Sequence, residues 1–221
     1  MFSYVFMKIL ENRPRSYDRA MDKASRGRVK QMKEDVAAEV PNGSRVLEIG
    51  CGTGELAAMC IARGSTVEGF DTSPTMVEVA RRRIEEKGLS DKFTVEEMGV
   101  DGMDSLLDRT YDAVVSTLVF SELSDDERRY ALKNAHRVLK PGSICVIADE
   151  VQPRTSGKKV LYFMIRGPVL AVSYLVSKAI TRPIEDLTGE MKAAGFSVIK
   201  EVRSHDDAFA LVVGALEGVS S

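Results

Sequence analysis

The chain has 221 residues, enough for one sizeable core, and no linker rich in proline, glycine or serine divides it. Its 44% hydrophobic and 29% charged residues exclude wholesale disorder and a fibrous structure. The formal charge of −2 offers no general attraction for a nucleic-acid backbone. Three cysteines without metal-ligand or redox spacing and an N-terminus without a secretory signal pattern predict a cytoplasmic protein with reduced thiols.

Strand-length apolar runs alternate with helical patterns from Arg45 onward, which is typical of a parallel sheet covered by helices on both faces. Strands are predicted at 45–49, 66–70, 93–97, 113–116 and 144–148, and helices at 27–40, 55–63, 73–87 and 125–139. Pro141 and Gly142 are expected to end the last of these helices and turn the chain into the next strand. Further on, a helix is predicted at 184–194 and an antiparallel strand pair at 196–202 and 209–215.

The run VLEIGCGTGEL places Gly50, Gly52 and Gly54 directly after a predicted strand and before a helix. Glycine permits positive φ and has no Cβ, so a ligand can lie against the backbone of such a turn. A dinucleotide site would have another glycine at position 55, where the carboxylate of Glu55 would repel a pyrophosphate. Asp71 ends the following strand and is placed to accept hydrogen bonds from ribose hydroxyls. It indicates a ribose without identifying the cofactor.

The segments VLEIGCGTG, VEGFDTSPTMVEVA, YDAVVS and HRVLKPG resemble, in order and spacing, the successive motifs of the class I S-adenosylmethionine (SAM)-dependent methyltransferases. The resemblance covers roughly residues 41–150. It implies a Rossmann-like α/β fold with a seven-stranded, mostly parallel sheet, helices on both faces and a terminal antiparallel hairpin. It also implies a SAM-dependent methyltransferase in which residues 41–221 bind SAM and residues 1–40 form a helical extension or lid.

The resemblance assigns one set of residues to the methionine and ribose portions of SAM. Gly50, Cys51 and Gly52 would line these portions, Asp71 would hold the ribose, and Glu48 would steady the loop. Two of these residues have simpler interpretations. Cys51 is expected to be a small packing residue because no base lies near it in sequence, and Glu48 could merely cap local backbone.

A second set is expected around the adenine. Thr72 and Met76 would flank the ring, although Met76 at helical spacing could also be plain core. The segment that usually meets the adenine amino group departs from the family pattern here, so either Val100 or Asp101 takes that position.

Thr117 and Leu118 are expected to close over the methionine end of SAM. Methyl transfer from a sulfonium is an in-line displacement that requires alignment and exclusion of water, with an acid or base optional. Glu122 and His205 are weak catalytic candidates, with a helix cap or solvent as the alternative for Glu122 and a turn cap as the alternative for His205. The segment after Ser116 lacks the Asn/Asp-Pro-Pro-Tyr motif of base-amino methyltransferases, and no metal site is expected.

The two ends of the chain are expected to set substrate choice. An apolar insert at about 157–182 is similar in position to that of quinone-biosynthesis (UbiE-like) methyltransferases. It is too short to span a bilayer, so we expect a lid over an apolar or amphipathic small-molecule acceptor, a partner surface or a peripheral membrane contact. Tyr17 is a candidate to fold over the cofactor, with an ordinary surface aromatic as the alternative.

The opening YVFMKILENRPRSYDRAMD and the later TRPIEDL also resemble the corrinoid protein-associated methyltransferases. This second resemblance implies a corrinoid protein as partner. It leaves open an accessory SAM-binding role in corrinoid methyl-transfer metabolism.

Overall fold

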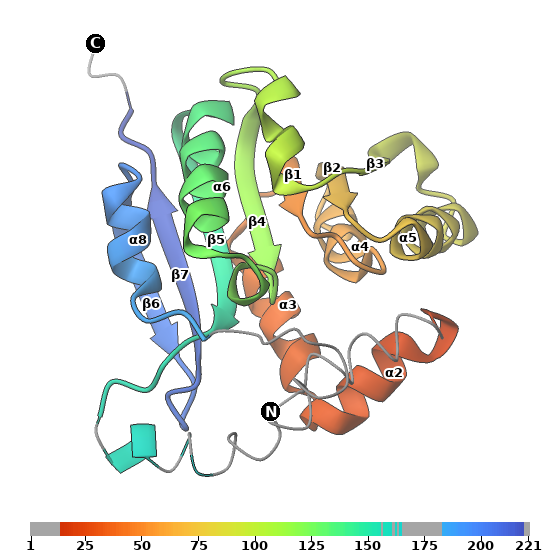
Figure 1. Ribbon diagram of the computed structural model, residues 1–221. Coiled ribbons are helices and arrows are strands. Elements are labelled where there is room, and N and C mark those ends of the chain that lie inside the picture. Colours follow the sequence, from red (N-terminus) through yellow and green to blue (C-terminus); the bar gives the residue numbers. More distant parts are fainter. Residues whose placement is uncertain (1–13, 156, 161, 163, 165–182, 219–221) are drawn as a thin grey trace.

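The computed structural model of this chain describes residues 14–155, 157–160, 162, 164 and 183–218 (Figure 1). The helices in this part are α2 (Pro14–Ser25), α3 (Arg28–Glu39), α4 (Glu55–Ala62), α5 (Pro74–Glu86), α6 (Asp125–Val138) and α8 (Leu187–Ala193). Short 3-10 turns are η1 (Ser90–Lys92), η2 (Val100–Ser105) and η3 (Phe120–Glu122). The strands are β1 (Arg45–Ile49), β2 (Thr66–Asp71), β3 (Phe93–Glu97), β4 (Tyr111–Thr117), β5 (Leu139–Glu150), β6 (Ser197–Arg203) and β7 (Phe209–Ala215).

These strands form one sheet in the order β3-β2-β1-β4-β5-β7-β6. Strands β1 to β5 pair in parallel, and β7 runs antiparallel to both β5 and β6. The predicted mostly parallel, seven-stranded sheet with a terminal antiparallel hairpin is therefore confirmed. The central strands are rich in Val, Ile and Leu because helices cover both of their faces.

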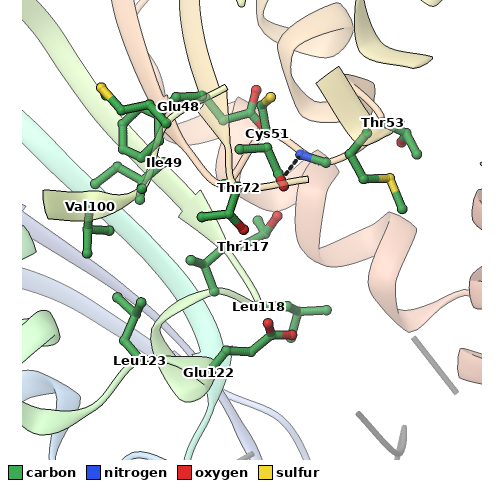
Figure 2. A pocket seen from close by; sticks show the side chains of 18 of the residues that line it. Glu48, Ile49, Cys51, Thr53, Thr72, Val100, Thr117, Leu118, Glu122 and Leu123 are labelled. Atoms are coloured by element: carbon green, nitrogen blue, oxygen red, sulfur yellow. Dashed lines mark hydrogen bonds between the residues drawn. The ribbon is translucent and has the colours of Figure 1, made fainter. Parts of the chain in front are cut away.

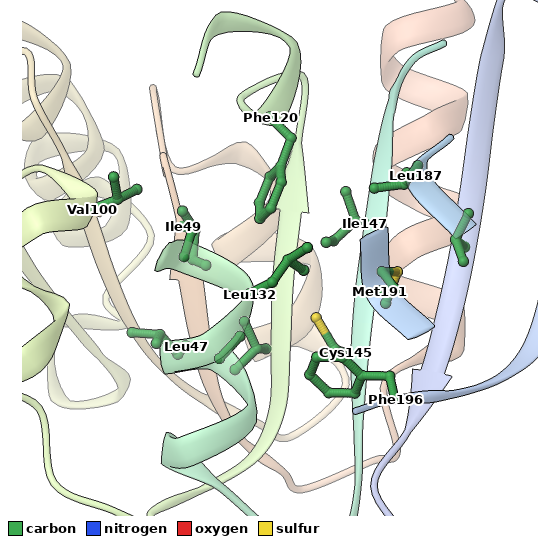
Figure 3. Close-up of a cluster of buried hydrophobic side chains, with 14 of the residues drawn as sticks. Leu47, Ile49, Val100, Phe120, Leu132, Cys145, Ile147, Leu187, Met191 and Phe196 are labelled. Carbon is green, nitrogen blue, oxygen red and sulfur yellow. The ribbon is translucent and has the colours of Figure 1, made fainter. Parts of the chain in front are cut away.

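Alternate residues of the central strands enter two separate cores. On one face, Leu47 and Ile147 pack with side chains of α6 and α8, the core drawn in Figure 3. On the other face, Val46 and Val146 pack with side chains of α3, α4 and α5. The period of two along a strand produces this division, and it explains why both faces need helices.

The N-terminal helices continue the fold beyond the sheet. Helix α3 contributes Val36 and Ala37 to the second core, as does Val40 directly after it, and α2 lies beyond the carboxyl ends of the parallel strands (Figure 1). Asp18 on α2 accepts a hydrogen bond of 2.8 Å from the Thr53 hydroxyl and pairs with Arg83 on α5. These contacts tie α2 to the start of α4 and to α5. The boundary at residue 40 between extension and domain stays a prediction.

The helix predicted at 125–139 ends one residue earlier, and Pro141 and Gly142 do not form the turn expected of them. Helix α6 ends at Val138, and β5 already begins at Leu139. Tyr111 pairs with Leu139 and Ala113 with Ile144, so residues 140–143 bulge from the ladder. Gly142 adopts φ +80° within this bulge, a conformation that glycine permits.

Helix α8 begins later than the sequence pattern predicts. Ile184 instead forms a parallel bridge with Val151, and Asp186 caps the helix by accepting the N–H of Gly189 at 2.9 Å. Most of the insert at 157–182 lies outside the described residues, so the interpretations of that segment stay predictions. Within the described part of the chain, no helix is long and apolar enough to cross a membrane.

Candidate functional site

A cavity of about 350 Å³ opens at the carboxyl ends of β1, β2 and β4. Strand β1 lies between β2 and β4, so the chain order reverses at this point of the sheet. Such switch points leave a crevice between the loops that follow the strands, where open α/β sheets bind their ligands. Figure 2 shows Glu48 and Cys51 at one end of the cavity and Leu118, Glu122 and Leu123 at the other.

The loop after β1, residues 50–54, is called the glycine loop, and its residues 50–53 line the cavity. Gly50 has φ +68°, and a Cβ placed on it would lie 2.3 Å from Cγ2 of Val119. Gly52 has φ +50°, but a Cβ there would meet no atom within 4 Å because it would point into open space. Gly50 therefore allows the loop after β4 to approach, whereas Gly52 leaves room for a ligand.

Asp71 joins the ends of β1 and β2. Its carboxylate accepts the N–H of Gly52 at 2.8 Å, dashed in Figure 2, and that of Ser73 at 2.9 Å. An ionised carboxylate offers about four lone-pair positions, so about two remain for other donors. A half-buried carboxylate with free acceptor positions suits the vicinal hydroxyls of a ribose.

Glu48 is buried at the end of β1, with 2% of its surface exposed. Burial raises its pKa to about 8; the neighbouring Lys33 opposes this rise, and Asp71 adds to it. Its Oε2 atom has no hydrogen-bond partner among the described residues although it is buried. Unsatisfied buried oxygens are costly, so this atom fits a donor supplied by a ligand.

Cys51 is a packing residue in this geometry. It is 4% exposed, and Gly69 on β2 makes room for it, since a Cβ on Gly69 would lie 2.9 Å from Cβ of Cys51. Burial raises the pKa of the thiol far above its usual range, with Glu48 and Asp71 adding to the effect. A thiol held protonated in this way is a poor nucleophile.

The lining is acidic with one cation among the described lining residues. Its acidic residues are Glu48, Asp71, Asp101, Glu122 and Glu127. The cation is Lys33 of α3, whose ammonium lies 2.8 Å from Glu55 and whose side chain is 14% exposed. An acidic cavity favours a cationic ligand over an anionic one.

The structure brings together nearly all of the predicted cofactor residues. The ones that line the cavity are Glu48, Gly50, Cys51, Gly52, Asp71, Thr72, Met76, Val100, Asp101, Thr117 and Leu118. Both candidates for the adenine amino group are present, and the choice between Val100 and Asp101 stays a prediction. Tyr17 belongs to α2, and its role over the cofactor also stays a prediction.

The two weak catalytic candidates, Glu122 and His205, lie in different parts of the structure. Glu122 lines the cavity, whereas His205 is exposed in the turn between β6 and β7 and is absent from the lining. No group of three or more His, Cys, Asp or Glu in the described residues could hold a metal ion.

Sequence reasoning missed the residues that the N-terminal helices contribute. Met21 of α2 and Val29 and Lys33 of α3 line the cavity. A signal was present in the sequence, because Lys33 stands four residues after Val29 and four before Ala37, on the buried stripe of α3. A lysine within an apolar helical stripe is a reason to suspect a charged ligand or partner.

A single reversed strand, β7, inserted between β5 and the edge strand β6, a glycine turn after β1 and an acid at the end of β2 are the features of a class I methyltransferase. Comparison with known proteins agrees, since the family model of the methyltransferase domain matches residues 46–142. The demethylmenaquinone methyltransferase of Thermus thermophilus is 34% identical over 174 residues, covering 72% of this chain and 76% of that protein. The chain belongs to the SAM-dependent methyltransferases and is similar to their quinone-biosynthesis members.

A second relative extends the similarity along the chain. The demethylmenaquinone methyltransferase of Geobacillus stearothermophilus is 29% identical over 207 residues, 86% of this chain and 87% of that protein. Among solved structures, a SAM-dependent methyltransferase from Methanosarcina mazei superposes with a TM-score of 0.64 at 17% identity, covering 83% and 97% of the two chains. The [4+2]-cyclase SpnF superposes with a TM-score of 0.65 at 21% identity, covering 84% and 80%. These structural matches show the fold alone, which also serves other reactions.

Proposed function

We propose that this chain binds SAM in the cavity at the carboxyl ends of β1, β2 and β4 and methylates an apolar or amphipathic small molecule of the reduced demethylnaphthoquinone type. The cofactor assignment rests on one observation: Gly52 and Asp71 are joined by a hydrogen bond, and the cavity beside Gly52 is open. The similarity to two demethylmenaquinone methyltransferases supports the acceptor class.

The residues present fit SAM at four points. Asp71 would accept the ribose hydroxyls with its remaining lone pairs, and the open space at Gly52 would admit the ligand against the loop backbone. The unpartnered Oε2 of Glu48 would accept from the α-ammonium of the methionine portion. Lys33, the lining cation, would face the carboxylate of the methionine portion.

Bound SAM supplies an electrophilic methyl group on a positively charged sulfur. The chain would align the acceptor with that methyl group and exclude water, because a displacement on carbon is fast only when the reacting atoms are held in line. Carboxylates around the cavity would favour the sulfonium over the neutral thioether product, so loss of charge would assist product release.

Apolar side chains dominate the cavity wall that follows β4. Leu118, Val119 and Leu123 line it, and Glu122 is the charged group between them. Such a wall suits a ring acceptor better than a phosphorylated one, since the carboxylates of the lining would repel phosphate. Loss of a phenolic proton to solvent makes a reduced quinone nucleophilic at its neighbouring ring carbon. That carbon would form a bond to the methyl group as the methyl–sulfur bond breaks, and it would then release its hydrogen as a proton to restore the aromatic ring.

The test is transfer of a labelled methyl group from SAM to a water-soluble reduced demethylnaphthoquinone. We expect methylated product with the wild-type chain and, at a SAM concentration below the wild-type dissociation constant, at least about tenfold slower formation with Asp71→Ala. The competing hypothesis is an accessory role beside a corrinoid protein. A stable complex with a corrinoid protein, without turnover on any naphthoquinol, would replace our proposal by that role.

A further inference from the structure

The loop that follows β4 has an unusual backbone at the cavity. Leu118 lines the cavity with φ +60°, a left-handed conformation that leucine rarely adopts. The next residue, Val119, abuts the glycine loop at Gly50. A conformation of this kind persists only where the surroundings hold it.

Hydrogen bonds to Ala148 and Asp149 on β5 hold this loop in place. The N–H of Leu118 donates to the carbonyl of Ala148 at 3.0 Å, and the N–H of Ser121 donates to Asp149 Oδ2 at 3.2 Å. Burial raises the pKa of this carboxylate, and hydrogen bonding from the backbone of Val119 and Phe120 and from the Ser121 side chain opposes the rise by favouring the ionised form. Its other oxygen, Oδ1, accepts the N–H of Glu150 at 2.6 Å.

Asp149 has no direct access to the cavity. It is 0% exposed and absent from the lining, whereas residues 117–119 and Glu122 do line the cavity. No side chain of the loop caps the turn η3, so the Asp149 carboxylate takes the place of an N-cap from a different strand. A buried carboxylate is costly and is kept only where several donors satisfy it.

We propose that Asp149 is a positioning residue that fixes residues 118–121 as the wall over the methionine end of the cofactor. This inference rests on the proposed placement of SAM, in which Asp71 holds the ribose and Thr117 and Leu118 face the methionine portion. It predicts that Asp149 matters for ligands that carry a methionine portion and is irrelevant to those that end at the ribose.

The experiment compares S-adenosylhomocysteine with adenosine, which lacks the amino-acid portion. Binding is measured by calorimetry at about pH 8.5, where burial, which raises the pKa of Asp149 to about 7, still leaves the carboxylate ionised. In Asp149→Asn we expect S-adenosylhomocysteine to bind about fivefold more weakly or worse, with adenosine changed by less than about twofold, since one charge-assisted hydrogen-bond acceptor is lost. The amide proton of Ser121 should move upfield in the same variant.

Asp112→Asn is the matched control. Asp112 also accepts a backbone N–H, that of Arg45 at 2.8 Å, but it lies at the start of β4, the opposite end from the cavity. Both ligands should bind this variant as they bind the wild type. If Asp149→Asn does not fold, Ser121→Ala removes a hydroxyl donor from the same carboxylate and should show the same selectivity for S-adenosylhomocysteine, about threefold.

Two results would overturn the inference. One is S-adenosylhomocysteine affinity within about twofold of wild type in folded Asp149→Asn, or in Ser121→Ala where the first variant does not fold. The other is an equal loss for both ligands, which would mean a general disturbance of the site. Because no acceptor takes part, failure of methyl transfer to a naphthoquinol leaves this test unaffected.

Discussion

The backbone N–H of Gly52 donates a 2.8 Å hydrogen bond to the carboxylate of Asp71, and this contact joins the glycine loop after β1 to the end of β2. One side chain thus sets the loop conformation and also faces the space for a ribose. A change at Asp71 should disturb both.

Asp71→Ala should lower SAM affinity at least about tenfold. The variant loses acceptors for two ribose hydroxyls, each hydrogen bond to a charged group being worth roughly 1.5 to 3 kcal/mol. Calorimetric titration measures the change, and Asp71→Asn, which keeps one oxygen acceptor, should lie between wild type and Asp71→Ala. An unchanged dissociation constant in folded Asp71→Ala would remove this residue from the site.

Substitutions at Gly50 and Gly52 should have opposite signatures. Gly52→Val places its side chain in open space, so SAM binding should be lost while the apo protein loses only the roughly 1 to 3 kcal/mol that a strained φ costs. Gly50→Ala carries the same backbone strain and also collides with Val119, so its melting temperature should fall further. Near-normal SAM affinity in Gly52→Val would show that the loop does not approach the cofactor.

The sequence was informative where a pattern is local. The strand at 45–49 and the hairpin strand at 209–215 follow from apolar runs, and the glycine turn follows from a backbone conformation that favours glycine. The contributions of α2 and α3 to the cavity could not be located, because they depend on contacts between distant residues, such as Asp18 with Arg83. The bulge at 140–143 also escaped prediction, since proline and glycine end helices more often than they interrupt strands.

Glu48→Gln should change how stability depends on pH. The folded-state pKa of Glu48 is raised to about 8 by burial, so the unfolded chain ionises first as pH rises from about 4.5. Wild-type stability therefore contains a term that falls between these values, by at most about 1.4 kcal/mol per pH unit. Glu48→Gln lacks this term, and its unfolding free energy relative to wild type should increase from pH 5 to pH 8.

Denaturant unfolding of both proteins across that range provides the measurement. Asp149, whose pKa burial also raises, is present in both proteins, so its contribution cancels in the difference. A difference that is flat with pH would mean that Glu48 ionises normally in the folded state.

Arg83→Ala should speed the dissociation of SAM. Arg83 of α5 holds Asp18 of α2, and Met21 on the same helix lines the cavity, so loss of the pair should loosen the helix over the site. Stopped-flow dissociation should be about threefold faster or more, as expected from losing a half-buried ion pair. Arg82→Ala is the control, because Arg82 pairs with Glu78 on its own helix, and an equal rate in both variants would contradict a role for α2 as a lid.

Titration of the wild-type chain with SAM and, separately, with NAD tests the central claim most directly. Glu55 follows the glycine loop where a pyrophosphate site would have glycine, and the lining carboxylates favour a cation. We predict that one SAM binds per chain and that NAD produces no binding heat. Binding of NAD without binding of SAM would contradict the assignment of the cavity and, with it, the proposed reaction.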